Sequence, residues 1–204
     1  MTGTLTRTFI AIELPSATRA HLAGEIARLG RALPGVRWAD PAGLHLTLAF
    51  LGELDDARLA EAHSATREAA LTVAPFALRI GGLGTFGPPG APRVVWAGVT
   101  GDLRALARLH EALAAALERR GFARDARPFA PHLTLARLRT PPTPDHAARL
   151  ASLVSASQRP TPASAAGAPI PVNSLSVMKS ELVRPAARYT RLHAVPLGQP
   201  AAQP

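Results

Sequence analysis

The sequence predicts an α+β protein of two similar lobes, in which antiparallel sheets line a central cleft and helices lie outside. Strands and helices follow in the same order twice along the 204 residues. The tetrapeptide His-Leu-Thr-Leu occurs once in each half, at His45 and at His132. Phe9 lies 36 residues before His45, and Val95 lies 37 before His132. These matched positions indicate an internal duplication, with the two lobes related by a pseudo-twofold axis.

The composition is typical of a folded globular chain, with 47% hydrophobic and 18% charged residues. We expect one bilobal domain over residues 1–195 and a frayed tail over 196–204. No apolar run approaches the roughly 20 residues that a membrane span needs. Residues 1–7 lack the pattern of a signal peptide, so we expect a cytoplasmic protein without membrane contact.

The cysteine content excludes some kinds of functional site, and the net charge bears on the kind of partner. The chain has no cysteine, which excludes disulfides, thiolate metal sites and cysteine nucleophiles. Its formal net charge of +9 favours an anionic partner such as nucleic acid. Lys179 is the only lysine, however, and the abundance of Arg, Ala and Pro indicates a compositional bias across the whole chain. The positive charge is therefore weak support for a nucleic-acid partner.

The pattern of the first half predicts strands at residues 6–14, 44–51 and 76–83, and helices at residues 16–30 and 55–71. Pro15 stops the first strand, and Ser16 is expected to cap the first helix. Gly52 is expected to close the second strand, after which Asp55 caps the second helix.

The second half reads as strands at residues 93–99, 129–138, 170–182 and 189–197, and helices at 102–121 and 144–154. Gly and Pro residues between 81 and 92 predict a loop, and 155–169 reads as a long surface loop. Asp102 is expected to cap the clearest helix. The apolar stripe of that helix is formed by Leu103, Leu106, Leu109, Leu113 and Leu117.

Strand geometry predicts which side chains of the repeated motif share a face. Alternate residues of a strand point the same way, so His45, Thr47 and Ala49 lie on one face. Leu46, Leu48 and Phe50 are expected on the opposite, core-facing side.

In the second copy, His132 and Thr134 share one face. A twofold axis would bring the two His-Thr faces together across the cleft. In-line displacement at phosphorus needs a base on the attacking oxygen and an acid on the departing one. Two imidazoles with an ordinary pKa of about 6.5 suit those roles, and threonine hydroxyls can hydrogen bond to phosphate oxygens.

A structural role is the ordinary interpretation of a single His-x-Thr segment, whereas two matched copies favour a shared site. Neither copy has the His-x-x-x-His spacing of a helical zinc site or a carboxylate on its face, so we expect no metal and no cofactor. The remaining histidines are interpreted as surface or structural residues: His21, His63, His110, His146 and His193.

Two His-x-Thr-x motifs in a chain of this length resemble the 2H phosphoesterase superfamily, and within it the RNA 2′,3′-cyclic phosphodiesterases, also called 2′-5′ RNA ligases. The resemblance covers nearly the whole chain. Its other similar segments are residues 9–15, Trp38 with 45–52, 92–96, 131–137, and 180–182 with 189–190.

The resemblance implies hydrolysis of a 2′,3′-cyclic phosphate on RNA to a 2′-phosphate. It makes His45 the proton donor to O3′ and His132 the base that activates water. It implies that Thr47 and Thr134 hold the phosphate.

The resemblance also places Arg137 near the phosphate. Strand parity puts Arg137 on the opposite face from His132, so a bulge or a strand end must redirect it. Phe9 is a candidate for stacking on the terminal base, with core packing as the alternative interpretation.

Several functional alternatives stay open. Ligation is the reverse reaction and is expected only as a weak capacity, while the absence of a phosphate-binding loop argues against an ATP-driven ligase. The same scaffold could act on ADP-ribose cyclic phosphate, a 2′-5′ oligoadenylate or another small nucleotide, or bind RNA without turning it over. A duplicated chain that completes its own site is expected to be a monomer.

Overall fold

The computed structural model describes residues 5–88, 90–158, 168–183 and 186–198. Its strands are β1 Thr6–Glu13, β2 His45–Leu54, β3 Phe76–Phe86, β4 Val94–Gly101, β5 His132–Arg137, β6 Ile170–Val172, β7 Ser174–Val183 and β8 Ala186–Pro196. Its helices are α1 Ser16–Ala32, α2 Asp56–Ala70, α3 Leu103–Glu118 and α4 Pro144–Ser157, with one 3₁₀ turn, η1 Pro41–Gly43. None of the described helices is long and apolar enough to cross a membrane.

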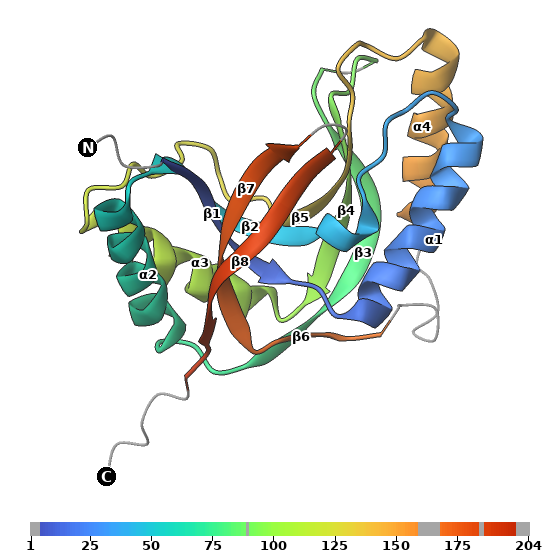
Figure 1. Cartoon of the computed structure of the whole chain (residues 1–204). Helices are drawn as coiled ribbons and strands as arrows, with labels where there is room; N and C mark the ends of the chain where they lie inside the picture. The colour runs from blue at the N-terminus through green and yellow to red at the C-terminus, as the bar shows by residue number, and fades with distance from the viewer. Residues whose placement is uncertain (1–4, 89, 159–167, 184–185, 199–204) are drawn as a thin grey trace.

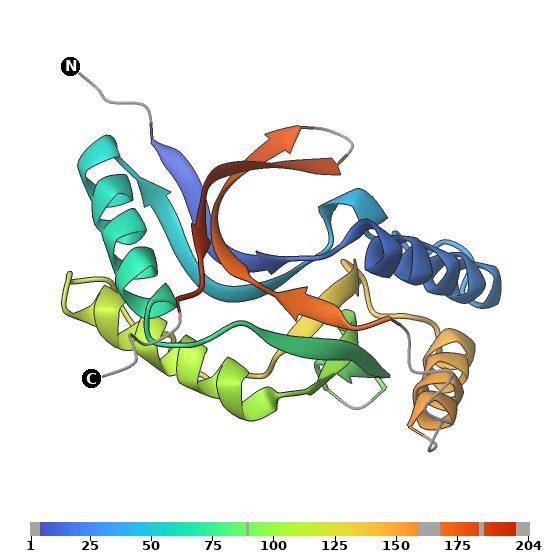
Figure 2. The same cartoon turned by 90° about the horizontal axis from the view of Figure 1, so that it is seen from below.

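The strands form two antiparallel four-stranded sheets, which confirms the predicted fold class. Their orders are β2-β1-β7-β8 and β5-β4-β3-β6. β7 and β8 curl over β1 and β2, while α1 and α4 lie side by side at one end and α2 and α3 at the other (Figures 1 and 2). Arg149 of α4 donates a hydrogen bond to the carbonyl oxygen of Ala32 at the end of α1.

The two sheets correspond strand for strand, but the first takes β7 and β8 from the second half of the chain, and the second takes β3 from the first half. β3 from the first half pairs with β4, and β7 from the second half pairs with β1. The predicted single strand at 170–182 is wrong for this reason, because Asn173 separates β6 in one sheet from β7 in the other. The lobes are therefore not the two halves of the sequence.

A β-bulge interrupts the first motif directly after Thr47. Ala11 pairs with Thr47 and Ile10 with Ala49, so Leu48 is an extra residue in β2. An extra residue reverses the alternation of the side chains that follow it. Phe50, expected in the core, is instead 64% exposed, and its ring contacts Phe9 on the face that carries His45.

The second motif carries the same bulge at the same place. Trp96 pairs with Thr134 and Val95 with Ala136, which leaves Leu135 as the extra residue. Arg137 is turned to the face of His132, so the predicted redirection by a bulge is confirmed. Phe50 and Arg137 occupy equivalent positions, five residues after their histidines.

The main core lies between the sheets and the helices and takes buried leucines, valines and alanines from both sheets. Helix α3 packs Leu106, Leu109 and Leu113 into it, whereas Leu103, placed in the stripe from the sequence, is 43% exposed. Asp55 and Asp102 cap α2 and α3 as predicted.

The expected helix cap and two of the expected segment ends are wrong. Ser16 is the first residue of α1, and no side chain caps that helix. β2 continues through Gly52, whose positive φ of 76° breaks the regular ladder without ending the strand. β3 extends to Phe86 across part of the predicted loop, because Gly84 lets the Trp96 ring lie directly against the backbone.

The ends of the predicted loops and tail also differ. Helix α4 runs into the predicted 155–169 loop as far as Ser157, and residues 159–167 lie outside the described part. In the tail, Leu197 and Gly198 donate hydrogen bonds to Asn173 and Ala70. They are held in place rather than frayed, and 199–204 lie outside the described residues.

Candidate active site

The two motif histidines begin the two edge strands that lie next to each other where the sheets meet (Figure 1). Nδ1 of His45 lies 2.8 Å from the carbonyl oxygen of Gly43, and Nδ1 of His132 lies 2.7 Å from that of Ala130. A carbonyl oxygen only accepts, so both Nδ1 atoms donate. Nε2 of each neutral ring is then free to accept a proton.

Aromatic rings hold the imidazole of His45. Phe9 stacks on it with centroids 4.6 Å apart, and Tyr189 meets it edge-on at 5.0 Å. Phe9 is only 1% exposed, so it presents no free face to a base in this structure. Its position instead supports a role in orienting His45, in line with the core-packing interpretation.

A different pair of rings surrounds His132. Phe86 meets the imidazole edge-on at 4.8 Å, and Trp96 lies 6.4 Å away in a tilted arrangement. Phe86 lies in the segment that the sequence analysis predicted to be a loop, and Trp96 lies in a predicted strand to which it gave no functional role. Their only sequence signal was their aromatic character, which equally suits core packing.

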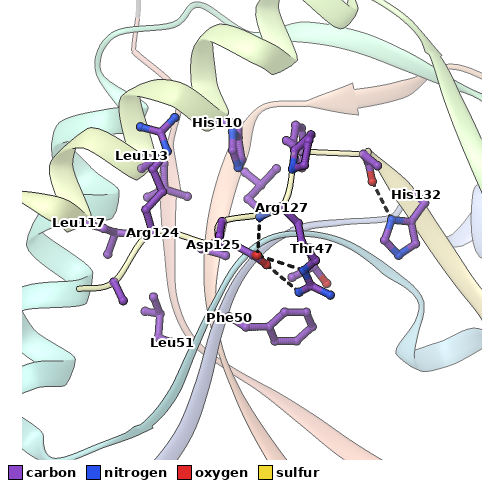
Figure 3. A pocket seen from close by; sticks show the side chains of 18 of the residues that line it. Thr47, Phe50, Leu51, His110, Leu113, Leu117, Arg124, Asp125, Arg127 and His132 are labelled. Carbon is purple, nitrogen blue, oxygen red and sulfur yellow. Dashed lines mark hydrogen bonds and ion pairs between the residues drawn. The ribbon is translucent and has the colours of Figure 1, made fainter. Parts of the chain in front are cut away.

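Two neighbouring hollows divide the predicted site residues between them. The larger, about 890 Å³, is lined by Thr47, His132 and Arg137 together with the loop 123–130 (Figure 3). The smaller, about 330 Å³, is lined by His45.

Three further residues lie close to the motif histidines. Glu13 and Arg191 line the smaller hollow and form an ion pair beside His45. Thr134 lines neither hollow and is half-buried two residues beyond His132.

Burial lowers the pKa of His45, and the nearby positive charge of Arg137 lowers it further. The hydrogen bond to Gly43 and the charge of Glu13 act in the opposite direction but do not outweigh burial. The neutral ring of His45 is therefore favoured in the free protein.

The loop before β5 contributes cleft residues that the sequence analysis missed. His110, interpreted as incidental, lines the larger hollow and stacks on Phe129 with centroids 3.9 Å apart. Arg124 and Arg127 line the same hollow. The charged residues of the loop 123–130 did not indicate from the sequence that this loop folds against the motif strands. Within the described residues, no three His, Cys, Asp or Glu side chains gather in a group that could hold a metal ion.

Known proteins resemble the chain over most of its length. The family model of the 2′-5′ RNA ligase superfamily matches residues 14–183. An RNA 2′,3′-cyclic phosphodiesterase of Methanothermobacter thermautotrophicus is 30% identical over 184 residues, 90% of this chain and 95% of that protein. One of Geobacillus stearothermophilus is 38% identical over 149 residues, 73% of this chain, but the match spans only about half (47%) of that relative's length.

Solved structures of known proteins resemble the fold of this chain over nearly its whole length. TT0787 of Thermus thermophilus superposes with a TM-score of 0.72 at 30% identity, covering 95% of this chain and 99% of that one. E. coli LigT complexed with 3′-AMP gives 0.68 at 26% identity, covering 96% and 100%. Fold and paired motifs together define a 2H phosphoesterase. Within that class, the chain belongs to the 2′-5′ RNA ligase superfamily.

Proposed function

We propose that this protein is an RNA 2′,3′-cyclic phosphodiesterase, a hydrolase that opens a cyclic phosphate end to a 2′-phosphate without a metal ion. The duplicated histidine geometry carries the proposal. His45 and His132 begin adjacent strands, and each Nδ1 is bonded to a carbonyl two residues earlier, which leaves each Nε2 available for proton transfer. The names of the relatives support the same substrate class.

The reaction needs one proton taken and one given. Nε2 of His132 removes a proton from water as the water oxygen attacks phosphorus, and the P–O3′ bond breaks. Nε2–H of His45 gives its proton to O3′, so the product carries a 2′-phosphate and a 3′-hydroxyl. Thr47 and Thr134 donate hydrogen bonds to the non-bridging oxygens of the phosphate. The positive charge of Arg137 balances the negative charge of those oxygens.

The role of His45 as the acid depends on the bound substrate. Burial and Arg137 favour the neutral ring in the free protein, whereas an acid must be protonated. The negative charge of a cyclic phosphate beside His45 and Arg137 favours the imidazolium and offsets part of both effects. Substrate binding thus recruits the proton that the leaving oxygen requires.

Ligation is the same chemistry in reverse, with a 5′-hydroxyl in place of the attacking water. Water at high concentration favours hydrolysis, so we propose ligation as a weak capacity only. The substrate is an RNA end or a small cyclic nucleotide. We place the enzyme in the cytoplasm with its RNA substrate. We also propose a monomer, because one chain supplies the motif strands of both sheets.

The test is product analysis after incubation of the protein with a 2′,3′-cyclic-phosphate oligonucleotide in excess chelator. We expect a 2′-phosphate product, and a loss of roughly 10²- to 10⁴-fold in rate for His45→Ala and for His132→Ala. The exposed His21 of α1 provides a matched control, and His21→Ala should retain the wild-type rate.

Three results would reject the assignment: a 3′-phosphate product, full activity of either motif variant, or loss of activity with chelator. Faster turnover of ADP-ribose cyclic phosphate or of a 2′-5′ oligoadenylate in a side-by-side panel would reassign the substrate. RNA binding with steep salt dependence and no cleavage would identify a binding module instead.

A further inference from the structure

The last residue of β1, Glu13, lies directly across the ladder from His45, the first residue of β2. Directly opposed residues of antiparallel strands point to the same face, with Cβ atoms about 4.5–5.5 Å apart. Both side chains also line the smaller hollow. A carboxylate therefore lies beside the imidazole that the proposed reaction uses as its acid.

Two hydrogen bonds hold this carboxylate in place. Oε1 of Glu13 accepts one from Oγ of Ser176 at 2.5 Å and one from Nη1 of Arg191 at 3.3 Å. Ser176 lies on β7 next to β1 and is only 1% exposed, so water scarcely competes for its hydroxyl. The Arg191 side chain is 57% exposed, and water screens such an ion pair. The position of Glu13 therefore depends mainly on Ser176, and Arg191 only partly neutralises its charge.

The charge of Glu13 favours a proton on His45. Burial lowers the pKa of His45, and the hydrogen bond to the Gly43 carbonyl raises it. The positive charge of Arg137 lowers this pKa further, whereas the negative charge of Glu13 raises it. Glu13 thus opposes the two influences that keep the ring neutral in the free protein.

The smaller hollow holds more positive than negative groups. Its other described titratable residues are Arg19 of α1, Asp40 before η1, and Arg188, Tyr189 and Arg191 of β8. Asp40 is engaged with the 3₁₀ turn, because its side chain accepts a hydrogen bond from the backbone N–H of Ala42. Glu13 is therefore the carboxylate of this hollow that is directed at His45.

The carboxylate is kept apart from the residues that bind the phosphate. Thr47, His132 and Arg137 line the larger hollow, whereas Glu13 lines the smaller one. A negative charge in the larger hollow would repel the phosphate. From the smaller hollow, the same charge favours the protonated ring of His45 at little cost to substrate binding.

We propose that Glu13 is a positioning residue of this reaction, whose carboxylate stabilises the imidazolium form of His45 and so maintains the proton that His45 gives to O3′. The proposal rests on the proposed function, in which His45 is the acid. Glu13 itself gives and takes no proton. Nε2–H of His45 protonates O3′ as the P–O3′ bond breaks, and water protonates the ring again after the product leaves.

The test is the pH dependence of kcat/KM for a cyclic mononucleotide. At acidic pH His45 is protonated in every variant, so Glu13→Gln should match the wild type there. At alkaline pH the protonated fraction depends on Glu13, and Glu13→Gln should lower kcat/KM roughly 2- to 5-fold, the range for a partly exposed charge pair. This loss is small beside that expected for His45→Ala, since the acid itself remains.

An NMR titration and two further variants accompany the pH profile. The pKa of His45 in the free protein should be lower in Glu13→Gln than in the wild type, because a stabilising negative charge has been removed. Glu13→Asp keeps the charge and should retain most of the alkaline activity. Glu53→Gln makes the matched change at an exposed residue of β2 that lines neither hollow, and should leave the pH profile unaltered.

Arg191→Gln separates the charge of Glu13 from a structural role. If Glu13 acts on His45 through its charge, removal of the paired cation should leave alkaline kcat/KM the same or higher. If Glu13 only holds Arg191 in place, Arg191→Gln should reproduce the alkaline loss of Glu13→Gln. That second result would overturn the proposal.

The remaining outcomes separate this role from the proposed function. A loss in Glu13→Gln that is equal at every pH, or no loss at alkaline pH, would overturn the role of Glu13 while the phosphodiesterase stands. Absence of turnover in the wild type would reject the phosphodiesterase and with it this role, even if the NMR titration shows Glu13 acting on His45. Because each variant is judged by its ratio of alkaline to acidic activity, a partly unfolded preparation cannot imitate the expected result.

Discussion

At the scale of single residues, the two motif histidines share one hydrogen-bonding geometry but have different surroundings. His45 lies against Phe9 and Tyr189, whereas His132 lies against Phe86 and Trp96. Burial and the charge of Arg137 both disfavour a proton on His45. Duplication thus supplied two histidines with the same hydrogen bond at Nδ1, and different neighbours surround each ring.

The titration of His45 in the free protein tests this difference. We expect NMR to give a pKa below 6.5, because burial and Arg137 both disfavour the cation. Arg137→Gln removes the positive charge and should move that pKa upward, so the ring is protonated at higher pH. Arg108→Gln, a charge change on the outer face of α3, should not move it. A pKa above 6.5 would contradict the burial of His45. A pKa that Arg137→Gln leaves unchanged would contradict the placement of Arg137 beside His45.

At the scale of secondary-structure elements, bulges and close glycine contacts shape the strands that carry the site. The bulges at Leu48 and Leu135 turn Phe50 and Arg137 into the cleft. In β3, Gly84 faces the Trp96 ring so closely that a Cβ there would lie 2.1 Å from Cζ2. The Trp96 ring thus packs against the backbone of Gly84 and lies beside His132.

Gly84→Ala should therefore destabilise the protein, because the added methyl overlaps the indole and must push it aside. We expect a loss of about 1–3 kcal/mol in the free energy of unfolding, measured by urea denaturation. Gly24→Ala is the matched control. Gly24 lies inside α1 with nothing within 4 Å of a Cβ, and alanine there should add up to about 1 kcal/mol. Equal effects of the two changes would show that Trp96 does not pack on Gly84.

At the scale of the whole molecule, the exchange of third strands joins the two halves of the chain. The first sheet lacks β7 and β8 without the second half, and β3 lacks both of its neighbours, β4 and β6. The core likewise draws on residues from both halves. The duplicated units thus share both sheets and one core, and the histidine strands lie where the two sheets meet.

A break in the turn between β3 and β4 tests this coupling. We expect residues 1–88 alone to show no cooperative urea transition by circular dichroism, because their sheets are incomplete and their apolar faces uncovered. Mixing them with the remaining residues should restore the transition and the hydrolysis of a cyclic nucleotide. A cooperative transition in the isolated fragment would mean that the first half is a domain by itself.

Local patterns in the sequence were enough to predict most of the element order, apart from the division of residues 170–182 into β6 and β7, and to name most of the candidate site. Alternation and turn residues identified strands and helices, and Asp55 and Asp102 marked two helix starts, since caps act on neighbouring backbone. The predicted cap at Ser16 is wrong because the helix already begins at Ser16, which leaves Pro15, a residue without a side-chain acceptor, at the N-cap position. Matching Phe9 with Val95 was one residue off, as the ladders align Val95 with Ile10.

What the sequence by itself determined is the pair of His-Leu-Thr-Leu motifs, the duplicated order of elements and the family to which they point. Only the tertiary structure decided that β3 and β7 change sheets, that Phe50 faces the cleft, and that the loop 123–130 lines it. The physical reason is that a strand's partner and register depend on residues far away in the chain. One extra residue in a ladder reverses every side chain after it, and nothing within the strand itself announces that insertion.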